Sequence, residues 1–240
     1  MNLVIDQGNS SAKIALFEQD TIVHSLKAEV LSIEFLQAIM GEYQPQNGML
    51  CSVKSVDAAI QSLLTHQLPV FYNMNHQLAL PLVIDYRMPQ TLGVDRIAAA
   101  VGAVAQKPNQ DLLIIDIGTA ITIDWVTASG SYKGGNISPG PDLRFKALHA
   151  FTGKLPLVDT SGELPVLGYD TTTAIRSGVI NGIVRELDSY LDEYNKNAQV
   201  FSFLTGGYAF YFESKLKNAT FADENLVLKG LNEILNYQQI

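Results

Sequence analysis

The chain has 240 residues, of which 47% are hydrophobic and 17% are charged, the balance of a folded globular protein. Its net charge is −8, from 16 basic and 24 acidic residues, and it has no long run of lysine or arginine. Binding to a nucleic acid backbone needs a concentrated basic face, so we expect no nucleic acid partner.

Three further features bear on location. The N-terminus, MNLVID, reaches Asp6 without a basic start or a long apolar stretch, which is not typical of a signal peptide. The most continuous later apolar run, 97–105, has only nine residues and is far too short to span a membrane. One cysteine, Cys51, cannot form an internal disulfide. We therefore expect a cytoplasmic protein without a membrane partner.

Segments of strand and helix character alternate along the chain, which indicates an α/β architecture. In the first half we expect strands at 3–6, 12–17, 49–53 and 70–72, helices at 32–41 (ended by Gly41) and 57–66, an irregular loop with Pro81, Pro89 and Gly93, and an alanine-rich helix from about Asp95. The polar stretch 107–111 is a plausible boundary between a domain at 1–108 and a domain at 109–240.

The second half begins again with a strand, a turn and a strand at 113–126. We then expect a Gly/Pro-rich loop at 134–141, a long helix from Thr171 or Thr172 with a core-facing stripe, a strand at 200–204 and an amphipathic helix near 226–235. Gly178 and Gly182, one turn apart in the long helix, would let another backbone approach. The two halves resemble two copies of one topology, an arrangement that usually encloses a cleft.

The repeated feature is an Asp-x-Gly turn, in LVIDQGNSSAKIALF and again in LIIDIGTAITIDWV. In the first copy Gly8 can take backbone angles closed to other residues, giving a tight hairpin whose amides point outward. The hydroxyls of Ser10 and Ser11 and the charge of Lys13 complete a seat for phosphate. Asp6 could hold Mg²⁺ through water.

In the second copy Asp116, Gly118 and Thr119 take the equivalent places. Either copy alone is more often an ordinary hairpin, and the duplication favours a functional interpretation. Asp95 alone would be read as a helix cap, and Tyr86 alone as packing. The four histidines are scattered without metal-like spacing, so we assign them no role.

Seven motifs follow one another in a specific order: DQGNSSAK, GVDR, IDIGTAITID, GGNISPG, TGKLPLV, GYDTTTAIRSG and LTGGYA. In this order they resemble the type III pantothenate kinases, in the superfamily of actin, sugar kinases and heat-shock chaperone ATPases. The match extends from Asp6 to about Ala209. The resemblance implies two similar ribonuclease H-like (actin-like) domains, with mixed sheets flanked by helices and an active-site cleft between them.

The resemblance also implies roles for individual residues. The ATP-binding residues would be Asp6, Gln7, Gly8, Asn9, Ser10, Ser11, Ala12, Lys13 and Thr119. The substrate-binding residues would be Tyr86, Gly93, Val94, Asp95, Arg96 and Thr171. Among these, Asp95 would be the catalytic base and Arg96 would contact the pantothenate carboxylate, while Asp116 would bind a monovalent cation, K⁺ or NH₄⁺.

The chain departs from the family pattern at two positions near these residues. Ser10 stands where the family has Thr and keeps the hydroxyl. Asp170 stands where the family commonly has Asn, which adds a charge beside Thr171. Leu204-Thr205-Gly206-Gly207 resembles the adenosine motif of the superfamily.

The implied activity is ATP-dependent phosphorylation of pantothenate to 4′-phosphopantothenate, the first step of coenzyme A biosynthesis, with Mg²⁺ and a monovalent cation, by a homodimer. The residue types fit this chemistry, because Asp95 can accept the proton of an alcohol and Arg96 offers a planar fork for a carboxylate. Two alternatives stay open: another small-molecule kinase of the superfamily, and a non-catalytic regulator. The short chain disfavours a sugar kinase, and the retained Asp95, Arg96, Asp116 and Thr119 disfavour a degenerate regulator.

Overall fold

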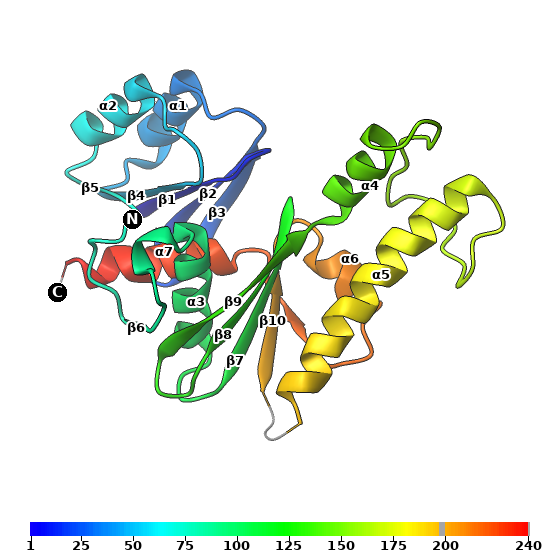
Figure 1. Cartoon of the computed structure of the whole chain (residues 1–240). Helices are drawn as coiled ribbons and strands as arrows, with labels where there is room; N and C mark the ends of the chain where they lie inside the picture. Colours follow the sequence, from blue (N-terminus) through cyan, green and yellow to red (C-terminus); the bar gives the residue numbers. More distant parts are fainter. Residues whose placement is uncertain (197–199, 240) are drawn as a thin grey trace. The chain divides into compact units, whose positions relative to one another are not determined.

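The computed structural model describes residues 1–196 and 200–239 and has an α/β fold with two sheets flanked by helices (Figure 1). The first sheet contains β1 (Asn2–Gln7), β2 (Ala12–Glu18), β3 (Thr21–Ala28), β4 (Asn47–Ser52) and β5 (Val70–Asn73). The second contains β6 (Val83–Ile84), β7 (Leu112–Ile117), β8 (Ala120–Val126), β9 (Ser131–Pro139), β10 (Phe201–Thr205) and β11 (Phe221–Ala222). The helices are α1 (Ile33–Tyr43), α2 (Ala58–Gln67), α3 (Val94–Gln106), α4 (Pro141–Ala150), α5 (Thr171–Tyr194), α6 (Ala209–Glu213) and α7 (Leu226–Tyr237), with a 3₁₀ turn, η1 (Pro89–Thr91).

The two sheets share one strand order. The first runs β3-β2-β1-β4-β5, and the second runs β11-β10-β7-β8-β9-β6. Read from β9, the second sheet repeats the first strand for strand, with β7 in the place of β1 and β10 in the place of β4. The pairs β1–β4 and β7–β10 are both parallel. The predicted α/β fold class with a duplicated topology is therefore confirmed.

Contacts between residues divide the chain into two compact units. Unit 1 comprises Met1–Gln110, Val126–Gly134 and Asn225–Ile240, and unit 2 comprises Asp111–Trp125 and Gly135–Glu224. Neither unit is continuous in sequence, because the segment Val126–Gly134 and the C-terminal helix α7 belong to unit 1. The division into domains at 1–108 and 109–240 stays a prediction.

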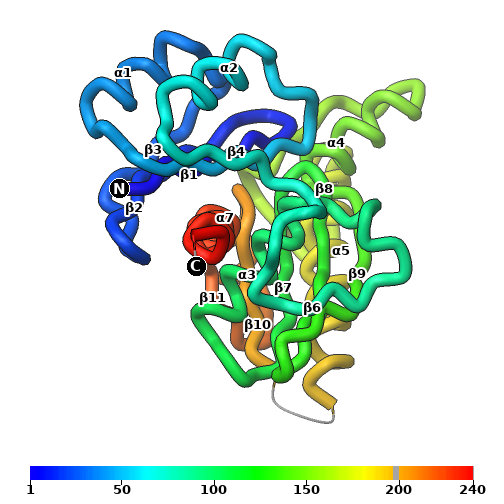
Figure 2. Tube along the Cα trace, turned by 90° about the vertical axis from the view of Figure 1, so that its left-hand side faces the viewer, coloured from blue at the N-terminus to red at the C-terminus, as the bar shows by residue number. Residues whose placement is uncertain are grey.

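Helices of unit 1 cover both faces of its sheet. Side chains alternate along β1, so Leu3 and Ile5 pack against α1 and α2, while Asn2 on the other face hydrogen-bonds Asn232 of α7. Figures 1 and 2 show α1 and α2 on one face of this sheet and α7 on the other. Helix α1 begins at Ile33, one residue after the predicted start, and Ser32 caps it with a hydroxyl that accepts the Phe35 N–H at 3.2 Å.

The backbones of helices α3 and α7 of unit 1 pack closely against each other at two glycines. A Cβ atom added to Gly230 would lie 1.7 Å from the Ala98 carbonyl oxygen, and one added to Gly102 would lie 2.4 Å from the Leu226 carbonyl oxygen. This contact needs glycine on both helices. It fixes α3, and with it the Gly93–Arg96 segment at the start of α3, within unit 1.

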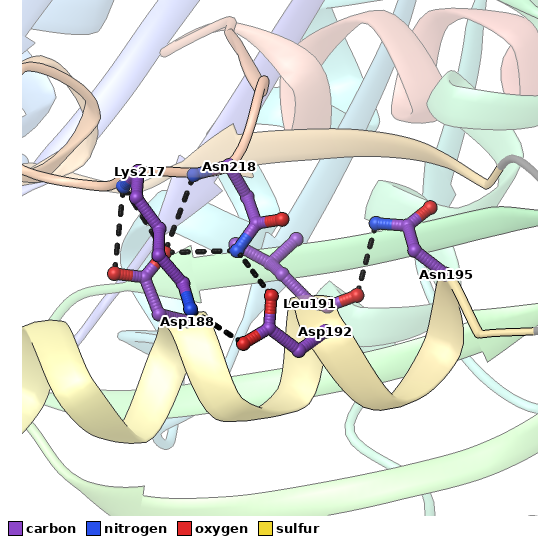
Figure 3. Close-up of polar contacts among 6 residues, drawn as sticks. All are labelled: Asp188, Leu191, Asp192, Asn195, Lys217 and Asn218. Atoms are coloured by element: carbon purple, nitrogen blue, oxygen red, sulfur yellow. Dashed lines mark hydrogen bonds and ion pairs between the residues drawn. The ribbon is translucent and has the colours of Figure 1, made fainter.

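The core of unit 2 lies between the second sheet and α5. The predicted stripe of α5 is buried as expected and packs against the sheet: Ile175, Val179, Ile183, Leu187 and Leu191. The connection between α6 and β11 is tied to the same helix by a buried carboxylate (Figure 3). Asp188 accepts the Lys217 N–H at 3.1 Å and the Asn218 side-chain amide at 3.0 Å, and Asn218 also bonds Asp192.

Several local predictions are wrong. Helix α1 continues past Gly41 to Tyr43 and ends with Gln44 in the left-handed conformation. The expected loop at 134–141 is mostly strand β9, followed directly by α4. No atom outside the neighbouring backbone lies within 4 Å of a Cβ added to Gly178 or Gly182, so among the described residues these glycines receive no close backbone. Across 1–196 and 200–239, no helix combines the length and the apolar character that crossing a membrane requires.

Candidate active site

The first Asp-x-Gly turn joins β1 to β2 at the edge of unit 1. In the hairpin register Asp6 faces Lys13, and the Gly8 N–H donates to the Ser11 carbonyl at 3.0 Å. Gly8 does not have a positive φ, so the predicted unusual backbone is wrong, and its amide is used inside the turn. Asn9 and Ser10 at the tip are exposed, which leaves polar groups available to a ligand.

The charges of Asp6 and Asp95 act on each other although 89 positions separate the two residues. Burial and the negative charge of Asp95 raise the pKa of Asp6 from 3.8 to about 6, and the positive charge of Lys13 opposes this shift. The base and the phosphate turn predicted from sequence are therefore neighbours in unit 1. An acidic pair of this kind fits Mg²⁺ held through water and phosphate oxygens.

Cys51 is the residue of β4 that pairs with Asp6, and it is fully buried. Burial, reinforced by the charges of Asp6 and Asp95, raises the pKa of its thiol well above the ordinary value. Its thiol therefore stays neutral. On the other face of the sheet, the adjoining residue Gln7 accepts a hydrogen bond from Ser52 at 3.0 Å.

The Gly93–Arg96 segment opens α3, with Gly93 as the N-cap residue. A Cβ on Gly93 would lie 2.5 Å from Asp95 Oδ1, and the same oxygen accepts the Arg96 N–H at 2.9 Å. The carboxylate is thus folded back over the first turn of the helix, at a place where a side chain on residue 93 would displace it. Arg96 itself is buried.

A histidine holds the residue that precedes this segment. The Nε2 atom of His76 lies 2.7 Å from the Leu92 carbonyl oxygen, which can only accept, so Nε2 carries the proton. The Leu92 side chain is buried, so the backbone before Gly93 is held from two sides. The sequence assigned His76 no role, because scattered histidines give no local signal.

Tyr86 follows the short strand β6 and is half-buried. Its ring packs edge-on against Tyr132 with the centroids 6.2 Å apart, and it lies 3.6 Å from a Cβ built on Gly134. These two contacts place Tyr86 beside β9 in unit 1. The substrate role of Tyr86 stays a prediction.

The second Asp-x-Gly turn, in unit 2, is shorter and more enclosed. Its Gly118 N–H donates to the Ala120 carbonyl at 2.9 Å, and Thr119 at the tip is exposed. A Cβ on Gly140 would lie 2.1 Å from the Gly118 carbonyl oxygen, so the start of α4 packs directly on the turn. Asp116, before the turn, is half-buried.

The LTGG motif lies against this turn. Thr205 pairs with Asp116 in the sheet, and Gly206 has a φ of +87°. A Cβ on Gly206 would lie 2.3 Å from Asp116 Oδ1 and 2.7 Å from the Ile117 carbonyl oxygen. Only glycine fits this position. Tyr208, which follows the motif, also bonds to this region. Its N–H donates to the Ile117 carbonyl, and the Tyr208 hydroxyl donates to Asp142 at 2.7 Å.

Thr171 is the first residue of α5 and is exposed. Asp170 caps this helix by accepting the Thr173 N–H at 2.7 Å, and this bond, with one from the Thr173 hydroxyl, lowers the pKa of Asp170. The departure from the family's Asn therefore keeps the capping function. Thr171 also lines an apolar pocket of about 800 Å³ between α4 and α5.

The structure thus brings the first turn and the Gly93–Arg96 segment together in unit 1. In unit 2 it brings Asp116 together with Gly206 and Gly140. Sequence reasoning missed Cys51 and Thr205 as neighbours of the two acidic strand ends. Each of these two residues pairs with its acid on the neighbouring parallel strand. This pairing can be recognised only when the strand order is known.

The comparison with known proteins decides the family. The family model for type III pantothenate kinase matches residues 2–193. A type III pantothenate kinase from Azobacteroides pseudotrichonymphae is 55% identical over 239 residues, covering 100% of this chain and 98% of its own.

The chain belongs to the type III pantothenate kinase family.

Solved structures agree on the fold. A conserved Baf family protein from Campylobacter jejuni, described as a candidate transcriptional activator, has a TM-score of 0.64 at 24% identity and covers 99% of this chain and 98% of its own. A candidate N-acetylmannosamine kinase from Listeria monocytogenes has a TM-score of 0.55 at 13% identity and covers 100% and 99%. The predicted actin-like and sugar-kinase-like fold and the predicted enzyme class, a kinase that uses ATP, are confirmed.

Proposed function

We propose that this type III pantothenate kinase transfers the γ-phosphate of ATP to the primary alcohol of pantothenate, with Asp95 as the general base. The observation that carries the proposal is the adjacency of Asp95 and Asp6 in unit 1. Phosphoryl transfer needs the acceptor alcohol next to the phosphates, so a base beside the phosphate-binding turn has the required position.

Asp95 accepts the proton of the attacking hydroxyl while the hydroxyl oxygen bonds to the γ-phosphorus, and the bond from that phosphorus to the bridging oxygen breaks to release ADP. Its carboxylate is held by the Arg96 N–H, so the base has a defined orientation before substrate binds. The buried guanidinium of Arg96 offers paired donors for the carboxylate of pantothenate. Tyr86 and Thr171 are further predicted substrate contacts.

The first turn, Asp6 through Lys13, binds the phosphates of ATP, and Thr119 adds a contact to the nucleotide. Asn9, Ser10 and the charge of Lys13 are suited to an anion. Asp6 would hold Mg²⁺, which would supply neutralisation of the charge on the phosphates. Asp116 in unit 2 would hold a monovalent cation, K⁺ or NH₄⁺.

We also propose that two copies associate through α4 and α5. The pocket between these helices is lined mainly by apolar side chains, among them Leu143, Ile175 and Val179. Phe151 and Leu157 nearby are 88% and 58% exposed. Apolar surface of this extent is typical of an interface. Light scattering should give a dimer that Leu143→Arg converts to monomer, while Leu26→Arg on β3 leaves it intact.

The substrate is tested by an assay with purified chain, ATP, Mg²⁺ and K⁺, following ³¹P signals of phosphorylated products. Pantothenate should be phosphorylated, and a panel of hexoses and N-acetylated sugars should not. Transfer to a sugar and not to pantothenate would replace the proposal with a sugar kinase. Transfer to no acceptor, with ATP bound, would favour a regulatory protein.

A further inference from the structure

The two sheets place different side chains beside their two acidic strand ends. In the first sheet Asp6 pairs with Cys51, and in the second Asp116 pairs with Thr205 at the corresponding position. Aligned residues of neighbouring strands project from the same face of a sheet. The face with Asp116 and Thr205 is opposite α5, because the alternate residues Ile115 and Leu204 pack against that helix.

The hydroxyl of Thr205 is deeply buried and has no partner. The residue is 1% exposed, and within the described part of the chain its Oγ1 and the Oγ of Ser202 are the buried side-chain polar atoms without a hydrogen bond. Buried hydroxyls are nearly always hydrogen-bonded, and a bound ion or water is one explanation for an exception. Thr205 lies next to a carboxylate, so a cation accounts for its oxygen.

We infer that Thr205 Oγ1 is a ligand of the monovalent cation at Asp116. The inference rests on the proposed cation site and adds to it a second protein ligand. A hydroxyl oxygen is a suitable neutral ligand for a hard cation, as carbonyl oxygens are, whereas the thiol of Cys51 at the corresponding place of the first sheet is not. The second turn is thereby distinguished from the first by the atom that faces its acid.

The geometry around Asp116 supports this assignment. Its Oδ1 lies against Gly206, the residue after Thr205, and would be only 2.3 Å from a Cβ atom added to Gly206. Gly206 therefore lets the carboxylate and the end of β10 approach each other. The oxygens of Asp116 and Thr205 belong to one unit, so the ligand pair does not depend on any motion between units.

The test measures thermal unfolding of the full chain against KCl, with N-methylglucamine chloride holding ionic strength constant. A ligand that binds only the folded state raises the Tm, so wild-type protein should become more stable with K⁺. Thr205→Val removes the unpartnered hydroxyl and keeps the shape of the side chain. This variant should have a higher Tm than wild type in the absence of K⁺. It should also increase the half-saturating K⁺ concentration by about tenfold or more.

Two variants serve as controls. Thr205→Ser keeps the oxygen and should retain the wild-type K⁺ response. Ser202→Ala removes the other unpartnered hydroxyl, on the opposite face of β10, and should leave the K⁺ response unchanged.

Equal K⁺ dependence in Thr205→Val and wild type would overturn the inference. If Asp116→Asn then abolished the response, the proposed site at Asp116 would stand without Thr205. A wild-type Tm that does not respond to K⁺ would overturn both the cation site and the inference, while the pantothenate assay would still test phosphoryl transfer by itself.

Discussion

The two Asp-x-Gly turns occupy the same place in two sheets of the same strand order, and they differ in what surrounds the acid. The first has an exposed tip at Asn9 and Ser10, and Lys13 faces its acid. The second is a short turn enclosed by Gly140 and Gly206. The same topology therefore presents two different surroundings: donors and a positive charge suit an anion, and enclosed oxygens suit a cation.

The largest expected effect comes from the glycines that pack on or within the two turns. A Cβ on Gly140 would lie 2.1 Å from a backbone oxygen of the second turn, so Gly140→Ala forces the backbone to move. We expect a loss of about 3 kcal/mol or more in the free energy of unfolding. Gly8→Ala would meet nothing closer than 3.4 Å, so we expect a change within about 0.5 kcal/mol. Urea unfolding of both variants measures this, and equal losses would contradict the difference between the turns.

The next effect concerns the acid of the first turn. Because the pKa of Asp6 is raised to about 6, the folded protein keeps a proton that the unfolded chain loses near pH 4. Stability therefore falls as the pH rises from about 4 to 6, by up to about 3 kcal/mol, and stays lower above this window. Asp6→Asn should be about 2 kcal/mol more stable than wild type at pH 8 without nucleotide and Mg²⁺, and equal at pH 4.

The matched control for this experiment is Glu29→Gln, which changes an exposed carboxylate of the same unit. Its unfolding free energy should follow wild type at both pH values. An Asp6→Asn protein that is less stable than wild type at pH 8 would mean that burial and Asp95 do not oppose the charge of Asp6.

The smallest effect tests how the base is positioned. His76→Ala removes the hydrogen bond to the Leu92 carbonyl, which is worth about 1 kcal/mol, so kcat should fall about fivefold with little change in the KM for ATP. Gln carries an amide at the position of Nε2 and Asn does not reach it. His76→Gln should therefore recover activity, and His76→Asn should behave like His76→Ala. Equal activity in all three would show that this bond does not position the segment.

Much of the fold could be predicted from the sequence, because buried strands and the α5 stripe are continuous or periodic apolar patterns. Strand β9 was missed because its glycines and Pro139 indicate a loop, and β3 because its side chains are mostly exposed. Glycines spaced within helices do not all have the same role in the structure. Gly102 and Gly230 permit a close helix contact, while Gly178 and Gly182 do not receive one, and only the pairing of α3 with α7 distinguishes them.

The sequence predicted the candidate site as separate motifs. The geometry of the site could not be predicted from them. The motifs identify Asp6 and Asp95, but their proximity depends on α3 packing against α7, a contact between distant parts of the chain. Cys51 and Thr205 have no motif of their own that indicates a neighbouring acid. Their position follows from the parallel pairing of β1 with β4 and of β7 with β10.

The most direct measurement is the turnover of Asp95→Asn with pantothenate and ATP, beside its affinity for ATP. The account predicts a kcat about 10²- to 10⁴-fold below wild type, because the proton of the alcohol loses its acceptor, with ATP affinity within about twofold. A variant that phosphorylates pantothenate at nearly the wild-type rate would contradict the role of Asp95 as base.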